Sequence, residues 1–300
     1  MNDPFAAPPV QAKPTILAGL IGRGIQASLT PAMHEREGAE QGLALSYRRI
    51  DLDAMGLGVE ALPDLLDRAE AAGFAGLNIT FPCKQAVVPL LHSLSDQARA
   101  LGAVNTVVLR DGKRVGHNTD CSGFAEGLSR GLPDVPLGEV VQLGAGGAGA
   151  AVAEALLRHG VGRLTIHDVE ARRAEDLAAA LRSRFGLARA RAGVALEEAF
   201  AGAVGMVNCT PVGMAKLPGT PVPVALLRPA LWVAEIIYFP LETALLRAAR
   251  ALGCRTLDGG GMAVFQAVGA YRLFTGREPD PARMLAHFSA LVGAPQPGAM

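Results

Sequence analysis

The sequence has few charged residues and no excess of either sign. Of its 300 residues only 19% are charged, and 28 Lys and Arg balance 28 Asp and Glu. Aromatic residues make up 5% of the chain, and no basic run is interleaved with them. Binding to a phosphate backbone requires clustered positive charge, often with aromatic side chains that stack on bases. We therefore expect no nucleic acid partner.

The residues that hold metals or form disulfides also lack their usual spacing. No C-x-x-C pair occurs, which argues against a zinc knuckle or a redox dithiol and favours reduced thiols in the cytoplasm. The six histidines show no H-x-x-x-H or comparable spacing, so we expect no metal. The four cysteines are Cys83, Cys121, Cys209 and Cys254.

Long apolar runs are absent as well. No run reaches the roughly 20 residues that a bilayer demands, and residues 1–14 contain Pro and Ala without the apolar core of a signal peptide. We expect no membrane association, and we interpret residues 1–14 as a short disordered leader.

The chain is rich in small and aliphatic residues, which suit buried parallel strands covered by helices. At this length two domains are expected, because a single core stops growing before 300 residues. The predicted fold class is α/β, with an N-terminal α/β domain over residues 1–119 and a Rossmann-type, doubly wound domain over 120–256. Residues 257–300 are predicted to form helices that pack back on the first domain.

The predicted elements alternate along the chain. The predicted strands are residues 16–20, 46–50, 75–79, 104–109 and 164–167, with others near 204 and 231, and Asp111-Gly112 closes a hairpin. The predicted helices are a helix from Pro31 and residues 59–72, 150–159, 262–275 and 281–292.

A glycine-rich turn follows the apolar run at 140–143, with the spacing of a dinucleotide-binding fingerprint. A helix, a second strand and Asp168 come next and complete a βαβ unit with an acid at its tip. Glycines let the backbone approach a pyrophosphate, the helix N-terminus stabilises its charge, and a carboxylate accepts hydrogen bonds from a ribose diol. The predicted cofactor contacts are Gly144, Ala145, Gly146, Gly147, Ala148, Gly149 and Asp168.

Asp168 predicts NAD as the cofactor, because a carboxylate there repels the 2′-phosphate of NADP. Arg172 and Arg173 follow within one turn. They can hold a phosphate if the loop rearranges, stack on adenine, or face solvent, so Arg173 is a further candidate cofactor residue and NADP stays the alternative.

Lys84 follows a strand and a turn in an otherwise apolar segment, and Asp120 ends a polar cluster at 116–120. A neighbouring carboxylate keeps an ammonium group charged and oriented, whereas burial acts in the opposite direction. That balance can bring a proton donor and acceptor near working pH. We interpret the two residues as a pair across a cleft between domains. The alternative is that Lys84 only opens a surface helix.

Together these strings resemble the shikimate dehydrogenase family almost end to end. Within it the likeness is closest to NAD-dependent quinate/shikimate dehydrogenases, because Thr30 stands where biosynthetic members usually have serine and Asp168 where NADP-dependent members usually have Asn-Arg-[ST]. Glu235, where aspartate is common, and Gly260, where a larger residue is common, are small departures. The matching segments are residues 28–34, 78–84, 102–106, 118–123, 208–214, 238–243 and 261–266.

The resemblance implies reversible hydride transfer between a nicotinamide and the ring carbon that bears the 3-hydroxyl group of quinate or shikimate. Lys84 would hold that hydroxyl and relay its proton, and Asp120 would orient both as the second member of a catalytic dyad. Ser28, Thr30 and Tyr238 would hold the substrate carboxylate, and Thr80, Asn105 and Gln266 the ring hydroxyls. Further implied cofactor contacts are Thr210, Pro211, Met214 and Gly261.

Each of these residues has a plainer interpretation. Ser28 or Thr30 can cap the following helix, Asn105 can close a turn, and Gln266 can face solvent. The nearest rival function is a biosynthetic, NADP-dependent shikimate dehydrogenase that reduces 3-dehydroshikimate.

Two rivals lie further away. A metabolite-binding relative without turnover should have lost Lys84 or Asp120, and both are retained. A methylenetetrahydrofolate dehydrogenase-like enzyme shares the two-domain plan but not these motifs. The expected partner is a small-molecule substrate, and the chain acts as a monomer or a homodimer.

Overall fold

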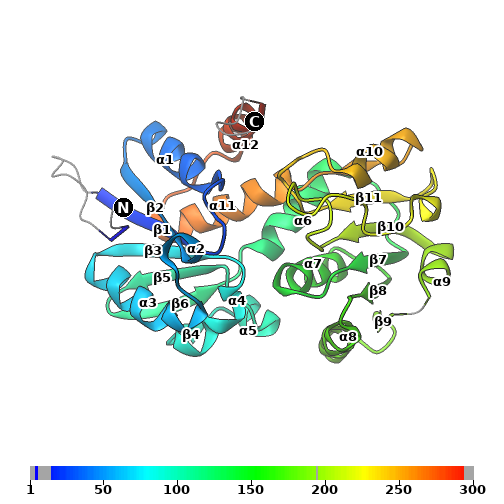
Figure 1. The fold of residues 1–300 in the computed structure, drawn as a ribbon, viewed down its shortest axis with the longest axis horizontal. Helices are drawn as coiled ribbons and strands as arrows, with labels where there is room; N and C mark the ends of the chain where they lie inside the picture. The colour runs from blue at the N-terminus through cyan, green and yellow to red at the C-terminus, as the bar shows by residue number, and fades with distance from the viewer. Residues whose placement is uncertain (1–3, 6–14, 194, 294–300) are drawn as a thin grey trace. The chain divides into compact units, whose positions relative to one another are not determined.

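The computed structural model describes residues 4–5, 15–193 and 195–293, and the chain divides into two compact units (Figure 1). The first unit is Met1–Thr119 with Gln266–Met300, and the second is Asp120–Phe265. Most of the predicted leader, residues 1–3 and 6–14, lies outside the described residues. Within the described residues, no helix combines the length and the apolar character needed to cross a membrane.

The first unit is built on a mixed sheet in the order β2-β1-β3-β5-β6-β4. β1 pairs in parallel with β2 and β3, whereas β5 runs antiparallel to β3 and β6. Asp111 and Gly112 close the predicted β5–β6 hairpin with φ angles of 53° and 68°, as a primed turn requires. The strands are β1 (Thr15–Gly22), β2 (Ala44–Asp51), β3 (Phe74–Ile79), β4 (Ser93–Leu94), β5 (Thr106–Arg110) and β6 (Lys113–His117).

Alternate residues of β1 face opposite sides of this sheet, so each face carries its own core. Leu17 and Ile21 belong to one apolar cluster, and Ala18 and Leu20 belong to the other. The helical elements of this unit, besides the C-terminal ones, are α1 (Thr30–Glu40), α2 (Leu52–Met55), η1 (Val59–Ala61), α3 (Leu62–Ala71), α4 (Cys83–Ala86), η2 (Val88–Leu90) and α5 (Asp96–Leu101).

Proline sets where two of these helices begin. α1 has Pro31 in its first turn, where the missing N–H has no partner to lose, and it begins one residue before the predicted start. The helix predicted over 59–72 begins later than expected: residues 59–61 form a 3₁₀ turn, and α3 starts at Leu62 with Pro63 in its first turn.

The second unit contains an all-parallel sheet in the order β12-β11-β10-β7-β8-β9. The chain moves outward from β7 to one edge and then returns to β10 to build the other half, so the strand order reverses between β7 and β10. This is the doubly wound arrangement, and its ligand crevice lies at the carboxyl ends of the two strands that flank the reversal. The α/β fold class predicted from the sequence is confirmed.

In the second unit the glycine-rich turn lies between β7 and α7. The strands are β7 (Glu139–Leu143), β8 (Arg163–His167), β9 (Ala190–Ala192), β10 (Ala203–Asn208), β11 (Trp232–Glu235) and β12 (Thr256–Leu257). The helices are α6 (Asp120–Gly131), α7 (Gly147–Arg158), α8 (Ala171–Phe185), α9 (Leu196–Ala201), η3 (Val224–Leu226) and α10 (Ala244–Ala251).

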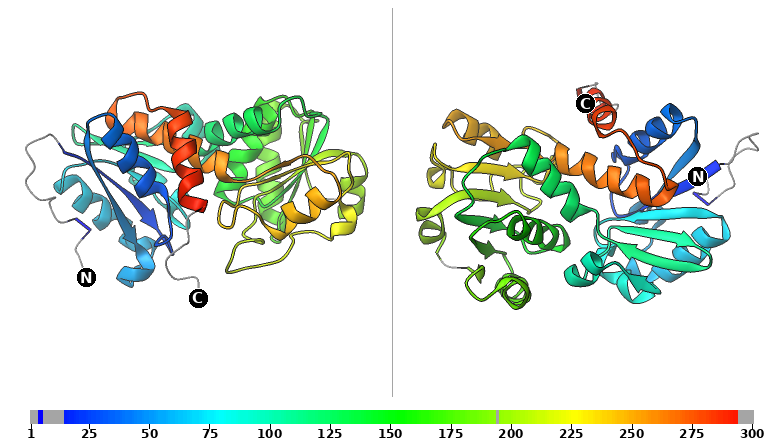
Figure 2. Two further views of the ribbon diagram at one scale, coloured as in Figure 1. Left: turned by 90° about the horizontal axis from the view of Figure 1, so that it is seen from above. Right: turned by 180° about the vertical axis from the view of Figure 1, so that it is seen from behind.

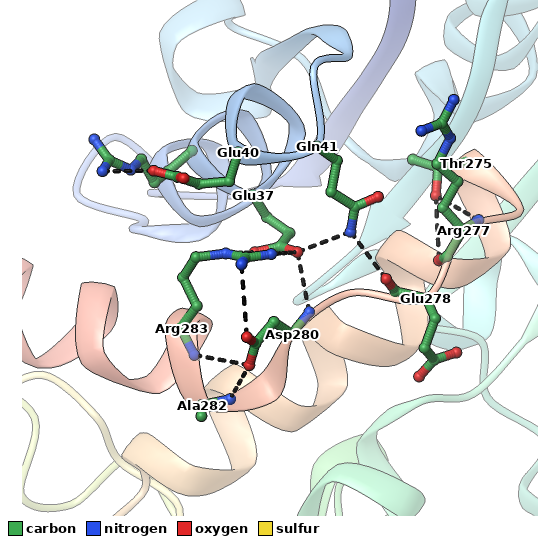
Figure 3. A network of polar contacts seen from close by, with 10 residues as sticks. Glu37, Glu40, Gln41, Thr275, Arg277, Glu278, Asp280, Ala282 and Arg283 are labelled. Atoms are coloured by element: carbon green, nitrogen blue, oxygen red, sulfur yellow. Dashed lines mark hydrogen bonds and ion pairs between the residues drawn. The ribbon is translucent and has the colours of Figure 1, made fainter.

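The C-terminal helices contact the first unit, as predicted. α11 (Gly260–Thr275) continues into that unit from Gln266, and α12 (Pro281–Gly293) lies beside α1 (Figure 2). The Glu37 side chain of α1 is only 1% exposed and receives Arg283 Nη2 at 2.6 Å and Nε at 2.8 Å (Figure 3). The Asp280 N–H and the Gln41 amide donate to the same carboxylate. An ion pair between the buried Glu37 carboxylate and the partly exposed Arg283 therefore attaches α12 to α1, the helix that follows the loop with Ser28.

Candidate active site

The loop between β1 and α1 is held by a carboxylate at the end of β2. Asp51 accepts hydrogen bonds from the backbone N–H groups of Gly24 (3.0 Å) and Ile25 (3.1 Å). Burial raises the pKa of Asp51, but these and further hydrogen bonds outweigh it and hold the pKa below its ordinary value. Ser28 lies in this loop and Thr30 begins α1, and both are almost fully buried. The N-cap residue Leu29 makes no side-chain capping hydrogen bond, but the Ser28 hydroxyl accepts the Thr30 N–H at 3.3 Å in the first turn of α1. The capping interpretation thus keeps support for Ser28.

A chain of buried hydrogen bonds includes Asn105, another of the predicted substrate residues. The Tyr47 hydroxyl donates to Asn78 Oδ1 at 2.7 Å, and Asn78 Nδ2 donates to Thr106 Oγ1 (3.0 Å) and the Asn105 carbonyl (3.2 Å). Thr106 Oγ1 in turn donates to Asn105 Oδ1 (3.0 Å). Asn105 Nδ2 donates to Thr119 Oγ1 (2.9 Å), and the Thr119 N–H donates back to Asn105 Oδ1 (2.7 Å). Asn105 is therefore held by its neighbours on both sides.

The backbone brings several predicted residues to the carboxyl end of β3. The Ile79 N–H donates to the Asn105 carbonyl (2.7 Å), and the Lys84 carbonyl accepts from the Val104 N–H (2.8 Å). Thr80 directly follows β3, and the Lys84 side chain is partly exposed. In the first unit these backbone contacts bring the positions of Thr80, Lys84 and Asn105 to the carboxyl end of β3. Their role in substrate binding stays a prediction.

Gln266 lies on α11, in a helix segment that packs against Thr119. One turn further along the helix, a Cβ on Gly269 would lie 3.0 Å from Thr119 Cγ2, so the helix backbone approaches Thr119 closely. Residues three apart share a helix face, which places Gln266 on the side of α11 that faces the Thr119 segment. Gln266 is partly buried rather than facing solvent fully.

Asp120 follows Thr119 directly and begins α6 of the second unit with 5% of its surface exposed. Tyr238, after β11 of that unit, is partly exposed. Lys84 belongs to the first unit, so the pairing of Lys84 with Asp120 stays a prediction.

The glycine-rich turn leaves no room for side chains at two of its positions. Gly144 has a φ of +97°, and a Cβ there would lie 2.8 Å from the Cys209 carbonyl group. A Cβ on Gly149 would lie 2.2 Å from the Gly144 oxygen, and the buried Gln142 amide donates to the carbonyls of both glycines at 2.9 Å. A Cβ on Gly146 would meet nothing within 4 Å. The turn is tight on its inner side and open at the start of α7, which fits a bound pyrophosphate.

Asp168 at the tip of β8 is tied to this turn. Its Oδ2 accepts the Ala145 N–H at 2.7 Å, and its Oδ1 accepts the Glu170 N–H at 2.9 Å. A cavity of about 390 Å³ adjoins Asp168 and is lined in part by Arg172. Arg173 forms an ion pair with Glu170 (2.8 Å) instead. Both the phosphate cradle and the acid beside it thus fit a dinucleotide.

The loop after β10 carries three more of the predicted cofactor residues. Thr210 donates to Asn208 Oδ1 from its N–H (3.0 Å) and its hydroxyl (2.7 Å), and the Met214 N–H donates to the Pro211 carbonyl (3.1 Å). Gly261 packs on α6, where a Cβ would lie 3.3 Å from the Gly127 Cα. Within the described residues, no group of three or more His, Cys, Asp or Glu could hold a metal ion.

The residues that the sequence analysis did not assign are those that hold these loops in place. Their common signal is a buried polar residue in one of the last two positions of a strand, where a side chain can reach the loop that follows. These residues are Asp51, Asn78, Gln142, Asn208 and Glu235.

The chain resembles known proteins over most of its length. Residues 20–107 match the family model described as the shikimate dehydrogenase substrate binding domain. A shikimate dehydrogenase (NADP(+)) from Streptomyces avermitilis is 60% identical over 279 residues, which cover 92% of this chain and 96% of the relative. A quinate/shikimate dehydrogenase (NAD(+)) from Corynebacterium efficiens is 54% identical over 281 residues, covering 92% and 99%.

A solved structure agrees with these relatives. The quinate dehydrogenase from Corynebacterium glutamicum, in complex with NAD, superposes with a TM-score of 0.86 at 51% identity and covers 92% of this chain and 99% of that one.

Proposed function

Because the chain belongs to the shikimate dehydrogenase family, we propose that it is an NAD-dependent oxidoreductase that reversibly oxidises the 3-hydroxyl group of quinate and shikimate. The products are 3-dehydroquinate and 3-dehydroshikimate. The four cysteines are free thiols, in keeping with an enzyme of the cytoplasm.

The observation that carries the choice of NAD is the position of Asp168. Both of its oxygens accept backbone N–H groups, one from the glycine-rich turn, so the carboxylate is fixed beside the cradle. A 2′-phosphate would meet this negative charge, whereas a ribose diol can donate to it. Arg173 and Arg172 each have a carboxylate partner, Glu170 at 2.8 Å and Asp176 at 3.6 Å. This arrangement supports NAD over NADP.

The residues that would hold the cofactor are those of the turn at 144–149, Asp168, and the loop with Thr210, Pro211 and Met214. The nicotinamide, when bound, exchanges a hydride with the ring carbon of the substrate. The protein supplies binding, orientation and the path of the proton.

Lys84, as the neutral amine, holds the reacting hydroxyl in this proposal and takes its proton as the hydride leaves, so that the amine becomes an ammonium group. Asp120 accepts a hydrogen bond from the ammonium group and keeps it aimed at the oxygen, so the two titrate as a pair. Asn105 and Gln266 orient the other ring hydroxyls, and the rigid hold of Thr119 and Thr106 on Asn105 supports such a role. Ser28, Thr30 and Tyr238 donate to the substrate carboxylate.

A second candidate is a biosynthetic enzyme that reduces 3-dehydroshikimate with NADPH. It is favoured by the 60% identity to the NADP-dependent relative, against 54% to the NAD-dependent one, and by Arg172 at the cavity beside Asp168. The two candidates share the fold and the dyad and differ in the cofactor.

Initial rates separate the candidates. The purified protein is assayed with quinate and with shikimate, each paired with NAD and with NADP at alkaline pH, and nicotinamide absorbance is followed. Turnover of both acids with NAD is expected. Turnover of shikimate with NADP alone would instead support the biosynthetic, NADP-dependent enzyme. No turnover in any pairing would refute the proposed activity.

A further inference from the structure

The Glu235 carboxylate at the end of β11 is buried and surrounded by hydrogen-bond donors. Asn208 Nδ2 lies 3.1 Å from Oε1 and 3.0 Å from Oε2. The Ile236 and Ile237 N–H groups donate to Oε1 at 3.0 and 3.2 Å, and the Thr243 hydroxyl donates to Oε2 at 3.3 Å. The residue is only 1% exposed. A carboxylate accepts all of these hydrogen bonds, whereas a neutral amide would turn its NH₂ group toward another donor.

Keeping a charge here is costly. Within the described part of the chain, Glu235 has no ion-pair partner, and burial raises its pKa to about 7 against the effect of its hydrogen bonds. Burial, together with the nearby Glu235 charge, raises the pKa of the Cys209 thiol well above its ordinary value, so that neighbour stays neutral. Burying a carboxylate without a cation costs stability that its hydrogen bonds offset only in part, so a role other than stability is sought for it.

The donors come from segments that border the ligand crevice. Asn208 ends β10 and also binds the loop that follows, through Thr210 and the Val212 carbonyl (3.0 Å). That loop touches the glycine-rich turn, since a Cβ on Gly144 would lie 2.8 Å from the Cys209 carbonyl group. Residues 208–214 therefore lie at the reversal point between β7 and β10, where a doubly wound sheet binds its ligand.

The second segment leads to α11. The Gly259 N–H donates to the Ile237 carbonyl at 3.2 Å, and a Cβ on Gly259 would lie 2.4 Å from the Ile236 oxygen. The Ala263 N–H then donates to the Gly259 carbonyl in the first turn of the helix. The Glu235 carboxylate thus accepts the N–H groups of Ile236 and Ile237, and the same two residues contact Gly259, just before α11 begins.

We propose that Glu235 is a positioning residue for the dinucleotide, holding residues 208–214 and the start of α11 in the shape that accepts its nicotinamide half. Asp168 follows β8, in the half of the sheet that binds the adenosine part of a dinucleotide. The half of the sheet with β10 and β11 therefore binds the nicotinamide part in this proposal. The inference rests on the proposed use of a nicotinamide dinucleotide, and it adds a residue that does not touch the cofactor itself.

The test compares Glu235→Gln with Glu242→Gln. Glu242 lies seven residues further on and is exposed in ion pairs with Arg250 (3.0 Å) and Arg247 (3.8 Å), so its loss of charge should leave the loop unchanged. Calorimetric titration gives the Kd of NAD without substrate. Amide hydrogen exchange of the protein without cofactor reports the order of 208–214 and 259–263 directly, and steady-state kinetics gives KM for shikimate.

Glu235→Gln is expected to raise the Kd of NAD on the order of 10- to 100-fold, because a hydrogen-bonded charge is lost. Exchange should accelerate in 208–214 and 259–263 but not in the turn at 144–149, and KM for shikimate should change by less than about twofold. The control should match the wild type.

An unchanged Kd for NAD would overturn the inference, as would exchange that accelerates equally throughout the second unit, which indicates a general loss of stability. Should Glu235→Gln fail to fold, Glu235→Asp keeps the charge but withdraws it by one methylene, and the same criteria apply with a smaller expected change. Wild-type turnover of quinate and shikimate tests the proposed function separately, because the exchange measurement needs no turnover.

Discussion

Replacing Tyr47 by Phe removes a single oxygen atom from the interior of the first unit. The hydroxyl donates to Asn78 Oδ1 at 2.7 Å, and the two residues are 5% and 4% exposed. Burial raises the pKa of Tyr47 well above its ordinary value, so the hydroxyl stays protonated and acts as the donor. The ring still fills its place after the substitution, and the change isolates one hydrogen bond.

The expected cost in the free energy of unfolding is about 1–3 kcal/mol, because a buried acceptor loses its partner. Thermal unfolding should show a drop of roughly 2–4 °C for each kcal/mol. Asn78 also supports Asn105 through its amide, so KM for shikimate should rise while kcat changes less.

Tyr271→Phe is the matched control. Tyr271 is fully buried, and among the described residues its hydroxyl has no hydrogen-bond partner. Its removal should leave stability unchanged or improve it. Equal losses in the two variants would show that the Tyr47 hydrogen bond contributes nothing specific, and an unchanged KM for Tyr47→Phe would refute its link to Asn105.

Three further predictions concern the dyad, the cofactor and pH. Lys84→Ala should lower turnover on the order of 10²- to 10⁴-fold with a smaller loss of substrate affinity, and near-wild-type rates would contradict the dyad. Asp168→Ala should relax the preference for NAD over NADP, measured as the ratio of kcat/KM values, and an unchanged ratio would rule out charge repulsion as its cause. Burial raises the pKa of Glu37, but hydrogen bonds from Arg283, Asp280 and Gln41 outweigh it and lower the pKa below 4.5. The stabilising contribution of Glu37 is therefore present above pH 4.5 and lost as pH falls through the lower pKa of the folded state. In urea unfolding, the loss of unfolding free energy caused by Glu37→Gln should shrink on acidification. Glu40→Gln, which removes an exposed pair with Arg36, should show little loss at any pH.

Much of the fold could be predicted because local rules and tertiary structure agree. The glycines at 144 and 149 are required by backbone contacts, and their spacing is visible in the sequence. Asp111-Gly112 adopts the positive φ angles that a tight hairpin needs. Where local rules were incomplete, element bounds shifted: Pro63 permits a helix start at Leu62, and the preceding residues close into a 3₁₀ turn.

The sequence by itself determined the α/β class, the position of the dinucleotide turn and the family, because periodicity, glycine spacing and motif strings are properties of neighbouring residues. Tertiary structure alone decided which side chains hold those motifs in place. Glu235 meets Asn208 across 27 positions and Tyr47 meets Asn78 across 31, so no local pattern records either pair. Burial then makes these contacts matter, because a donor or acceptor removed from water must find its partner within the fold.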